Sequence, residues 1–219
     1  MSLTRESFFS MFRSAALLWR ENIARLSEID SRFGDGDHGV TIGKMAALIL
    51  SRLSERKGES AKDFLESLGA ECMEIAGGSV GPLYGVLLEG LAGPLSAADA
   101  KINAATLKTM FSSARNALFE ITKARVGDKT LMDVLIPATE AAENAPDDVL
   151  SILKAAAAAA SRGLRETENQ VSKFGRARNY GEKTIGTPDA GAVSTALLFK
   201  GFQHGIEERL SAESFINHI

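Results

Sequence analysis

The segment RESFFSMFRSAALLWRENIARL, residues 5–26, decides the fold class of this chain. Apolar side chains recur in it every three or four residues, which is the period of a helix with one buried face. The apolar stripe consists of Phe8, Phe12, Ala15, Trp19, Ile23 and Leu26. The segment therefore predicts a long amphipathic helix.

The same period continues through most of the chain, and no convincing alternating strand pattern interrupts it. Glycine, proline and asparagine signals separate several of the helical runs, and no linker divides them. The further predicted helices cover about 38–54, 60–76, 80–91, 103–123, 130–143, 147–172 and 190–208. We therefore predict one all-α domain over residues 1–219, built of about eight helices.

Composition and charge exclude several classes of protein. The formal net charge of -3 argues against a surface that binds nucleic acid or an anionic membrane. Cys72 is the only cysteine, so no internal disulfide can form. The polar start of the chain contains no recognisable signal peptide, and no stretch reads as a membrane span. These features predict a cytoplasmic protein.

The loop EIDSRFGDGDHG, residues 28–39, carries the sharpest functional signal. Asp35 and Asp37 are two residues apart in a glycine-broken turn, and Asp30 at the end of the first helix can complete the cluster. Three carboxylates within ~5 Å would repel by about 3 kcal/mol per pair at an effective dielectric of about 20. The cluster therefore indicates a divalent cation, and all-oxygen ligands favour Mg2+, Mn2+ or Ca2+ over zinc. The loop is no EF-hand, since the glutamate at its twelfth position is missing; a solvated Asp-Gly turn is the alternative.

Two neighbouring features are suited to phosphate. His38 begins the next predicted helix, where a free backbone N–H and a ring N–H can meet a phosphate oxygen. The turn GGSVGPLYG, residues 77–85, joins two predicted helices and can present backbone N–H groups to the same kind of ligand. It is not a Walker A loop, because no Lys-Ser/Thr pair follows; a helix-breaking turn is the alternative.

Two later segments complete the set of motifs. Residues 127–130, Gly-Asp-Lys-Thr, open a helix, and Asp128 or Thr130 is suited to cap it. Residues 175–192 are rich in glycine and charge. Their arginines can neutralise phosphate, and Asp189 can contact a sugar hydroxyl or cap the last helix; a solvated loop is the alternative.

These four blocks, in this order, resemble the L subunit of dihydroxyacetone kinases, also called DhaL-type. The resemblance spans nearly the whole chain, and the Gly-Asp-Gly-Asp-His-Gly block, residues 34–39, is its most specific part. It implies a barrel of eight antiparallel amphipathic helices with a nucleotide bound at one end. It also implies that ADP or ATP and two Mg2+ ions are the cofactors.

The resemblance assigns roles to particular residues. Asp30, Asp35 and Asp37 would be the catalytic carboxylates that hold both metal ions. Leu131 would lie against the adenine, and Arg176, Asp189 and Gly191 would close the pocket. The residues implied at the phosphates are His38, Gly39, Thr41, Gly78, Ser79, Val80 and Gly81.

The chain departs from the family pattern at a few positions. Val80 stands where the family commonly has a serine, so one hydroxyl is absent while backbone donors remain. Asp189-Ala190-Gly191 replaces the common Asp-Pro-Gly, and Thr122 stands where a glycine is common.

The resemblance implies half of a phosphotransferase. Phosphate would pass to a ketose that is covalently bound to a histidine of a separate K subunit. Either ATP exchanges for ADP at each turnover, or ADP stays bound and is rephosphorylated through an M subunit of the phosphotransferase system.

Other functions remain open. The ketose can be a four-carbon sugar such as erythrulose. A fatty-acid kinase domain shares the fold, but its loop typically reads Pro-Asp-Gly-Asp-Thr-Gly, which disfavours it here. A nucleotide-binding regulator or adaptor without catalytic activity is the alternative from another class.

Overall fold

The computed structural model describes residues 2–55, 58–75 and 77–216, with side chains through residue 212. Ala76, at the end of the predicted helix 60–76, lies outside the described residues, as do residues 1 and 217–219 of the predicted domain. The α-helices are α1 (Arg5–Glu21), α2 (Ile23–Ser31), α3 (His38–Glu55), α4 (Ala61–Met73), α5 (Val80–Ala92), α6 (Ala104–Ile121), α7 (Met132–Asn144), α8 (Val149–Glu166) and α9 (Ala190–Ile216). Two 3-10 segments, η1 (Thr167–Asn169) and η2 (Ala177–Thr184), lie between α8 and α9. The predicted all-α class is confirmed.

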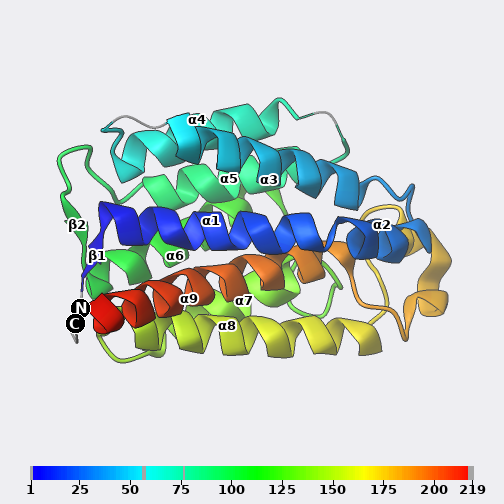
Figure 1. Cartoon of the computed structure of the whole chain (residues 1–219). Coiled ribbons are helices and arrows are strands. Elements are labelled where there is room, and N and C mark those ends of the chain that lie inside the picture. Colours follow the sequence, from blue (N-terminus) through cyan, green and yellow to red (C-terminus); the bar gives the residue numbers. More distant parts are fainter. Residues whose placement is uncertain (1, 56–57, 76, 217–219) are drawn as a thin grey trace.

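The helices close into a ring (Figure 1). Helix α1 packs on α3, α3 on α4 and α5, α5 on α6, α6 on α7, α7 on α8 and α8 on α9, which returns to α1. The ring is the predicted helical barrel. A short antiparallel pair, β1 (Leu3–Thr4) with β2 (Lys101–Ile102), lies at the end where the chain starts. Strands of two residues are too short to produce an alternating pattern, so the sequence did not predict them.

Aromatic side chains fill the centre of the ring. The Phe12 ring centroid lies 5.7 Å from that of Phe64 on α4 and 4.9 Å from that of Phe202 on α9. Offset and edge-to-face contacts of this kind stabilise beyond the area that they bury. Helices from both ends of the sequence are thereby joined around one core.

The first predicted helix is broken at Asn22. Its backbone there, at φ -109° and ψ 10°, departs from helical geometry, and its side-chain amide donates to the carbonyl of Leu18 at 2.8 Å. An asparagine that bonds locally in this way competes with the helical ladder. The apolar stripe therefore continues across two helices, and α2 carries Asp30 to the end of the ring opposite β1 and β2 (Figure 1).

Two glycines allow α9 to approach α1 closely. A Cβ at Gly201 would overlap the backbone of Ala15, and a Cβ at Gly205 would overlap the carbonyl of Ser10 and lie 2.9 Å from the Cα of Met11. The neighbouring atoms are backbone atoms, which cannot move aside without shifting a helix. The closure of the ring between α9 and α1 therefore depends on these glycines.

None of the described helices combines the length and the apolar content that crossing a lipid bilayer requires.

We expect Gly205→Ala to lower the free energy of unfolding by about 1–3 kcal/mol, since an overpacked contact costs more than the helix propensity of alanine contributes. The matched control is Gly43→Ala in α3. The nearest atom to its added Cβ is the terminal methyl of Ile23 at 2.8 Å, at the end of a flexible side chain. Urea unfolding of both variants measures the difference. Equal stability of the two variants would contradict the role given to Gly205.

Candidate functional site

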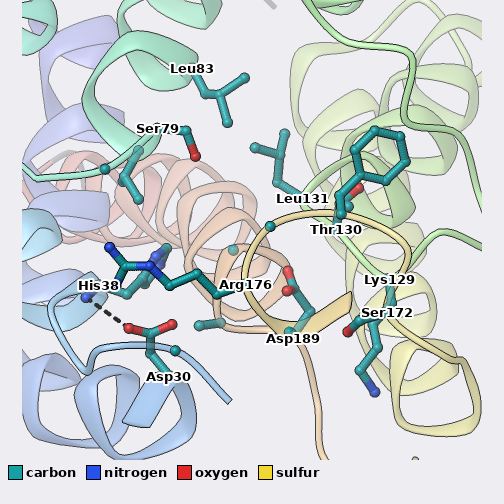
Figure 2. A pocket seen from close by; sticks show the side chains of 18 of the residues that line it. Asp30, His38, Ser79, Leu83, Lys129, Thr130, Leu131, Ser172, Arg176 and Asp189 are labelled. Atoms are coloured by element: carbon teal, nitrogen blue, oxygen red, sulfur yellow. Dashed lines mark hydrogen bonds between the residues drawn. The ribbon is translucent and has the colours of Figure 1, made fainter. Parts of the chain in front are cut away.

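The cavity at the α2 end of the ring has a volume of about 480 Å3. Volumes of about 300–1,000 Å3 are usual for small-molecule sites. Its wall combines the acidic loop, the start of α5, the start of α7 and the segment between α8 and α9. Figure 2 shows Asp30, His38 and Ser79 on one side, Leu131 and Asp189 on the other, and Arg176 extending between them. The four motifs of the sequence thus meet in one place.

The acidic loop brings the three predicted carboxylates together. One oxygen from each of Asp30, Asp35 and Asp37 lies within 4.8 Å of the others. A tight turn produces this geometry, since the Gly34 N–H donates to the Asp30 carbonyl at 2.6 Å and Gly36 has a φ of +76°. A Cβ at Gly34 would overlap the Asp30 carboxylate. An all-oxygen set at this spacing suits a hard divalent cation such as Mg2+.

Arg176 reaches the cluster from the far side of the cavity. Its guanidinium forms an ion pair with the Asp35 carboxylate, and both side chains are exposed. The two residues come from segments far apart in sequence, so only the tertiary fold places this positive charge beside the carboxylates. The contact also draws the segment before η2 toward the acidic loop.

His38 is buried at the start of α3. Its backbone N–H points to the Asp30 carboxylate at 3.4 Å, and its ring Nε2 lies 3.0 Å from the hydroxyl of Ser194 on α9. Burial lowers the pKa of His38 to about 4, while the Asp30 charge acts in the opposite direction. The imidazole is therefore neutral near pH 7. It offers the cavity a dipole rather than a charge.

A buried hydroxyl group supports this histidine. The Tyr84 hydroxyl on α5 donates to Ser194 at 2.9 Å, and the Ser194 hydroxyl lies 3.0 Å from the Gly191 carbonyl, its acceptor. One ring nitrogen of His38 is thereby occupied inside the protein. The sequence did not indicate Ser194 and Tyr84, because no local pattern marks a hydroxyl that becomes a neighbour of His38 only through folding.

Part of the glycine turn, residues 77–85, faces the cavity. Gly78, Ser79 and Val80 line the cavity. Ser79 precedes α5, but its side chain forms no capping hydrogen bond. The first N–H groups of the helix therefore receive no hydrogen bond acceptor from Ser79. A helix start of this kind is suited to an anion.

Three residues predicted at the phosphates do not line the cavity. A Cβ at Gly39 would overlap the Ile23 carbonyl, and one at Gly81 would lie 2.7 Å from the Cys72 carbonyl. The Thr41 side chain is buried against Gly77, and the backbone N–H of Thr41 donates to the Asp37 carbonyl at 2.9 Å. In this structure these residues serve close packing around the site, which explains why two of them are glycines.

Part of the cavity wall is apolar. It includes Val80 and Leu83 of α5 together with Ile121, Leu131 and Phe174. Leu131, which was predicted to lie against the adenine base, is 8% exposed and lies at the cavity just before α7. A flat apolar group can therefore pack against these side chains.

Asp189 and Gly191 lie at the start of α9, where both line the cavity. The Asp189 carboxylate accepts from the Ala192 N–H at 2.7 Å, which is the capping role that the sequence allowed. Burial raises the pKa of Asp189 to about 7, with the backbone bond to Ala192 acting in the opposite direction.

The Gly-Asp-Lys-Thr turn is organised by Asp133, which the sequence did not single out. The Asp133 carboxylate accepts from the N–H groups of Gly127 and Thr130, both at 2.7 Å. The Thr130 hydroxyl accepts from Met132 at 3.1 Å, at the start of α7 as expected. Asp128 instead accepts from the Arg125 N–H and pairs with Lys173. Lys129 is buried, and the sequence gave no signal for this.

Several known proteins have sequences similar to that of this chain. The DAK2 domain family matches residues 32–204. The ADP-binding subunit DhaL of PEP-dependent dihydroxyacetone kinase 1 from Listeria innocua is 31% identical, over 82% of this chain and 86% of its own length. D-erythrulose kinase of Mycolicibacterium smegmatis is 38% identical, over 78% of this chain and 30% of its own length. The first three curated relatives are erythrulose kinases, and the chain spans about a third of the length of each.

A solved structure shares the fold. The dihydroxyacetone kinase of C. freundii, solved with AMP-PNP and Mg2+, superposes with a TM-score of 0.68 at 22% identity. The match covers 93% of this chain and 34% of that chain. With an extensive family match, a full-length relative above 30% identity and a common helical ring, this chain belongs to the DAK2-domain family.

Proposed function

We propose that this chain binds a magnesium nucleotide in the cavity and donates its terminal phosphoryl group to a ketose held on a separate K-type subunit. The observation that carries the proposal is the convergence of three carboxylates and two helix starts at a cavity whose wall is partly apolar. The names of the relatives, which include ADP-binding subunits of dihydroxyacetone kinases, support the choice of ligand.

The acidic cluster would hold the metal. Asp30, Asp35 and Asp37 offer oxygen ligands alone, which match the preference of magnesium. We propose two ions there. When bound, magnesium supplies charge neutralisation and orientation of the phosphates.

The remaining residues on that side would position the phosphate chain. The N–H groups at the start of α5, which have no side-chain cap, would contact phosphate oxygens. The neutral His38 would lie beside the phosphates without repelling the metal. Arg176 would add a positive charge beside the carboxylates, since its side chain stays exposed while it pairs with Asp35 and can reach a second anion. Phosphoryl transfer needs this kind of positioning more than covalent chemistry from the protein.

The base would pack against the apolar wall. Leu83, Leu131 and Phe174 would provide its flat surface, and Asp189 and Gly191 would close the pocket from the start of α9. Val80, which has no hydroxyl group, would contact the phosphates through its backbone N–H.

The ketose would be held by the partner. A K-type subunit would dock at the mouth of the cavity, in the cytoplasm. Where ADP stays bound, an M subunit of the phosphotransferase system would lead to its rephosphorylation. The erythrulose kinases among the relatives make a four-carbon ketose the second candidate substrate.

We expect Asp37→Asn to have opposite effects on stability and on binding. The free carboxylates repel one another, so the variant should raise the unfolding free energy of the metal-free protein by about 1 kcal/mol. It should also weaken MgADP binding by more than about tenfold. Loss of a group that only orients a metal-coordinating side chain already costs about this much, and Asp37 would coordinate the metal itself. Thermal unfolding with EDTA and calorimetric titration with MgADP measure the two effects.

The matched control is Asp147→Asn at the opposite end of the ring, where Asp147 is exposed and pairs with Lys108. It should leave MgADP affinity unchanged. A destabilised Asp37→Asn protein with normal affinity would refute the metal assignment.

We expect the purified chain to transfer no phosphate to dihydroxyacetone or erythrulose from ATP by itself, and to do so once a K-type subunit is added. Labelled ATP and chromatography of the sugar phosphate measure the transfer. MgADP binding without transfer, in the presence of K-type subunits competent for either sugar, would favour the regulator instead. Native mass spectrometry for retained ADP separates the two modes of nucleotide use.

A further inference from the structure

The Lys129 ammonium is held inside the protein by backbone carbonyl groups. The side chain is 3% exposed, and Figure 2 shows it pointing away from the cavity. Its Nζ donates to the carbonyls of Thr167 at 2.6 Å, Thr184 at 2.8 Å and Thr187 at 2.6 Å, with a longer contact to that of Gln170 at 3.2 Å. Lysine is almost never buried so fully without a specific set of partners.

The geometry requires the charged form of this lysine. An ammonium has three N–H donors, whereas a neutral amine has only two and would direct a lone pair at a carbonyl. Burial lowers the pKa of Lys129, while Asp189, Glu168 and Asp133 act in the opposite direction. The carbonyl dipoles and these carboxylates thus offset the loss of hydration.

The backbone at Lys129 supports a specific role. Its φ of 60° is the only positive φ of a non-glycine residue in the described parts of the chain. A strained conformation persists only where its surroundings impose it, and such positions cluster at functional sites. The bonds of Asp133 to Gly127 and Thr130 fix the turn on either side. The turn thus directs the lysine inward.

The bonded carbonyls belong to the two ends of one segment. Thr167 and Gln170 lie just after α8, and Thr184 and Thr187 lie just before α9. The middle of this segment contributes Phe174 and Arg176 to the cavity wall. One ammonium therefore ties both ends of the loop that covers the cavity.

The segment has further contacts at its tip and near its base. At its tip, Arg176 pairs with Asp35, and the Tyr180 ring lies 5.2 Å from that of Phe33. Exposed pairs of this kind contribute little to stability. Near its base, the Ser172 N–H donates to the Thr184 hydroxyl at 3.0 Å, and the Gly186 N–H to the Glu168 carbonyl at 2.7 Å. Lys129 adds the charge that holds four carbonyls at one point.

We propose that Lys129 is a positioning residue: a fixed internal cation that holds segment 167–187 against the cavity so that Arg176 and Phe174 face the ligand. Only the identity of the ligand rests on the proposed function. The expected consequence is that removing the ammonium opens the segment and weakens nucleotide binding without disturbing the helical ring.

The test uses Lys129→Ala and a small cation that replaces the missing group. Alanine keeps the Cβ, so n-propylammonium supplies the three carbons and the ammonium that are lost. We expect amide hydrogen exchange in residues 172–186 of the full-length, nucleotide-free variant to quicken at least tenfold, and MgADP affinity to fall at least tenfold. Millimolar n-propylammonium should restore both, whereas tetramethylammonium, which has no N–H donor, should restore neither.

The matched control is Lys108→Ala. Lys108 also donates from Nζ to a backbone carbonyl, that of Ala145, at 2.6 Å, but between α6 and the loop after α7. Its loss should change neither exchange in 172–186 nor MgADP affinity, with or without the added cations. Normal exchange in Lys129→Ala, or rescue by both cations alike, would overturn the proposal.

Two measurements keep the inference testable if Lys129→Ala does not fold. Lys129→Gln retains two N–H donors without the charge and should show intermediate exchange. Refolding of Lys129→Ala from urea should recover folded protein with n-propylammonium and not with tetramethylammonium; failure in both would contradict the inference. If the unmodified chain binds no MgADP, the proposed function fails, while exchange and rescue still decide the role of Lys129.

Discussion

Mutual repulsion among three carboxylates governs the end of the ring where the cavity lies. Asp30, Asp35 and Asp37 bring like charges within 4.8 Å, and the Asp30 carboxylate lies so close to Gly34 that an added Cβ there would overlap it. The protein offsets the repulsion only in part, through the Arg176 ion pair and the His38 N–H. A divalent cation would relieve the repulsion that remains. The cluster therefore supports the proposed binding of a magnesium nucleotide.

The helical ring supplies the rigidity that this arrangement needs. Aromatic rings from α1, α4 and α9 meet in its centre, and two glycines let α9 lie against α1. Fixed helices determine where α3, α5 and α7 begin, and these starts surround the cavity. The acidic loop and the segment between α8 and α9 add the charged groups. Loops on a rigid frame commonly carry function in this way.

Distance along the sequence separates what could be predicted from what could not. The acidic cluster lies within residues 30–37, so the local turn almost decides its geometry, and the sequence predicted that the three carboxylates would meet. The helix start at His38, and the placement of Gly78, Leu131 and Asp189 on the cavity wall, also agree with the sequence. The break at Asn22 was missed because the apolar stripe runs across it unchanged. Gly39, Thr41 and Gly81 pack against neighbouring segments, and their contact with a ligand stays a prediction.

The sequence by itself determined the helical class, the acidic loop and the family, because periodicity, turn chemistry and short motifs are properties of neighbouring residues. Tertiary structure alone decided that Arg176 meets Asp35, that Ser194 supports His38, and that Lys129 binds four carbonyls from a distant loop. Each of those contacts joins segments far apart along the chain. A backbone carbonyl carries no side-chain signature, so nothing in the sequence marks which carbonyls will gather around a buried ammonium.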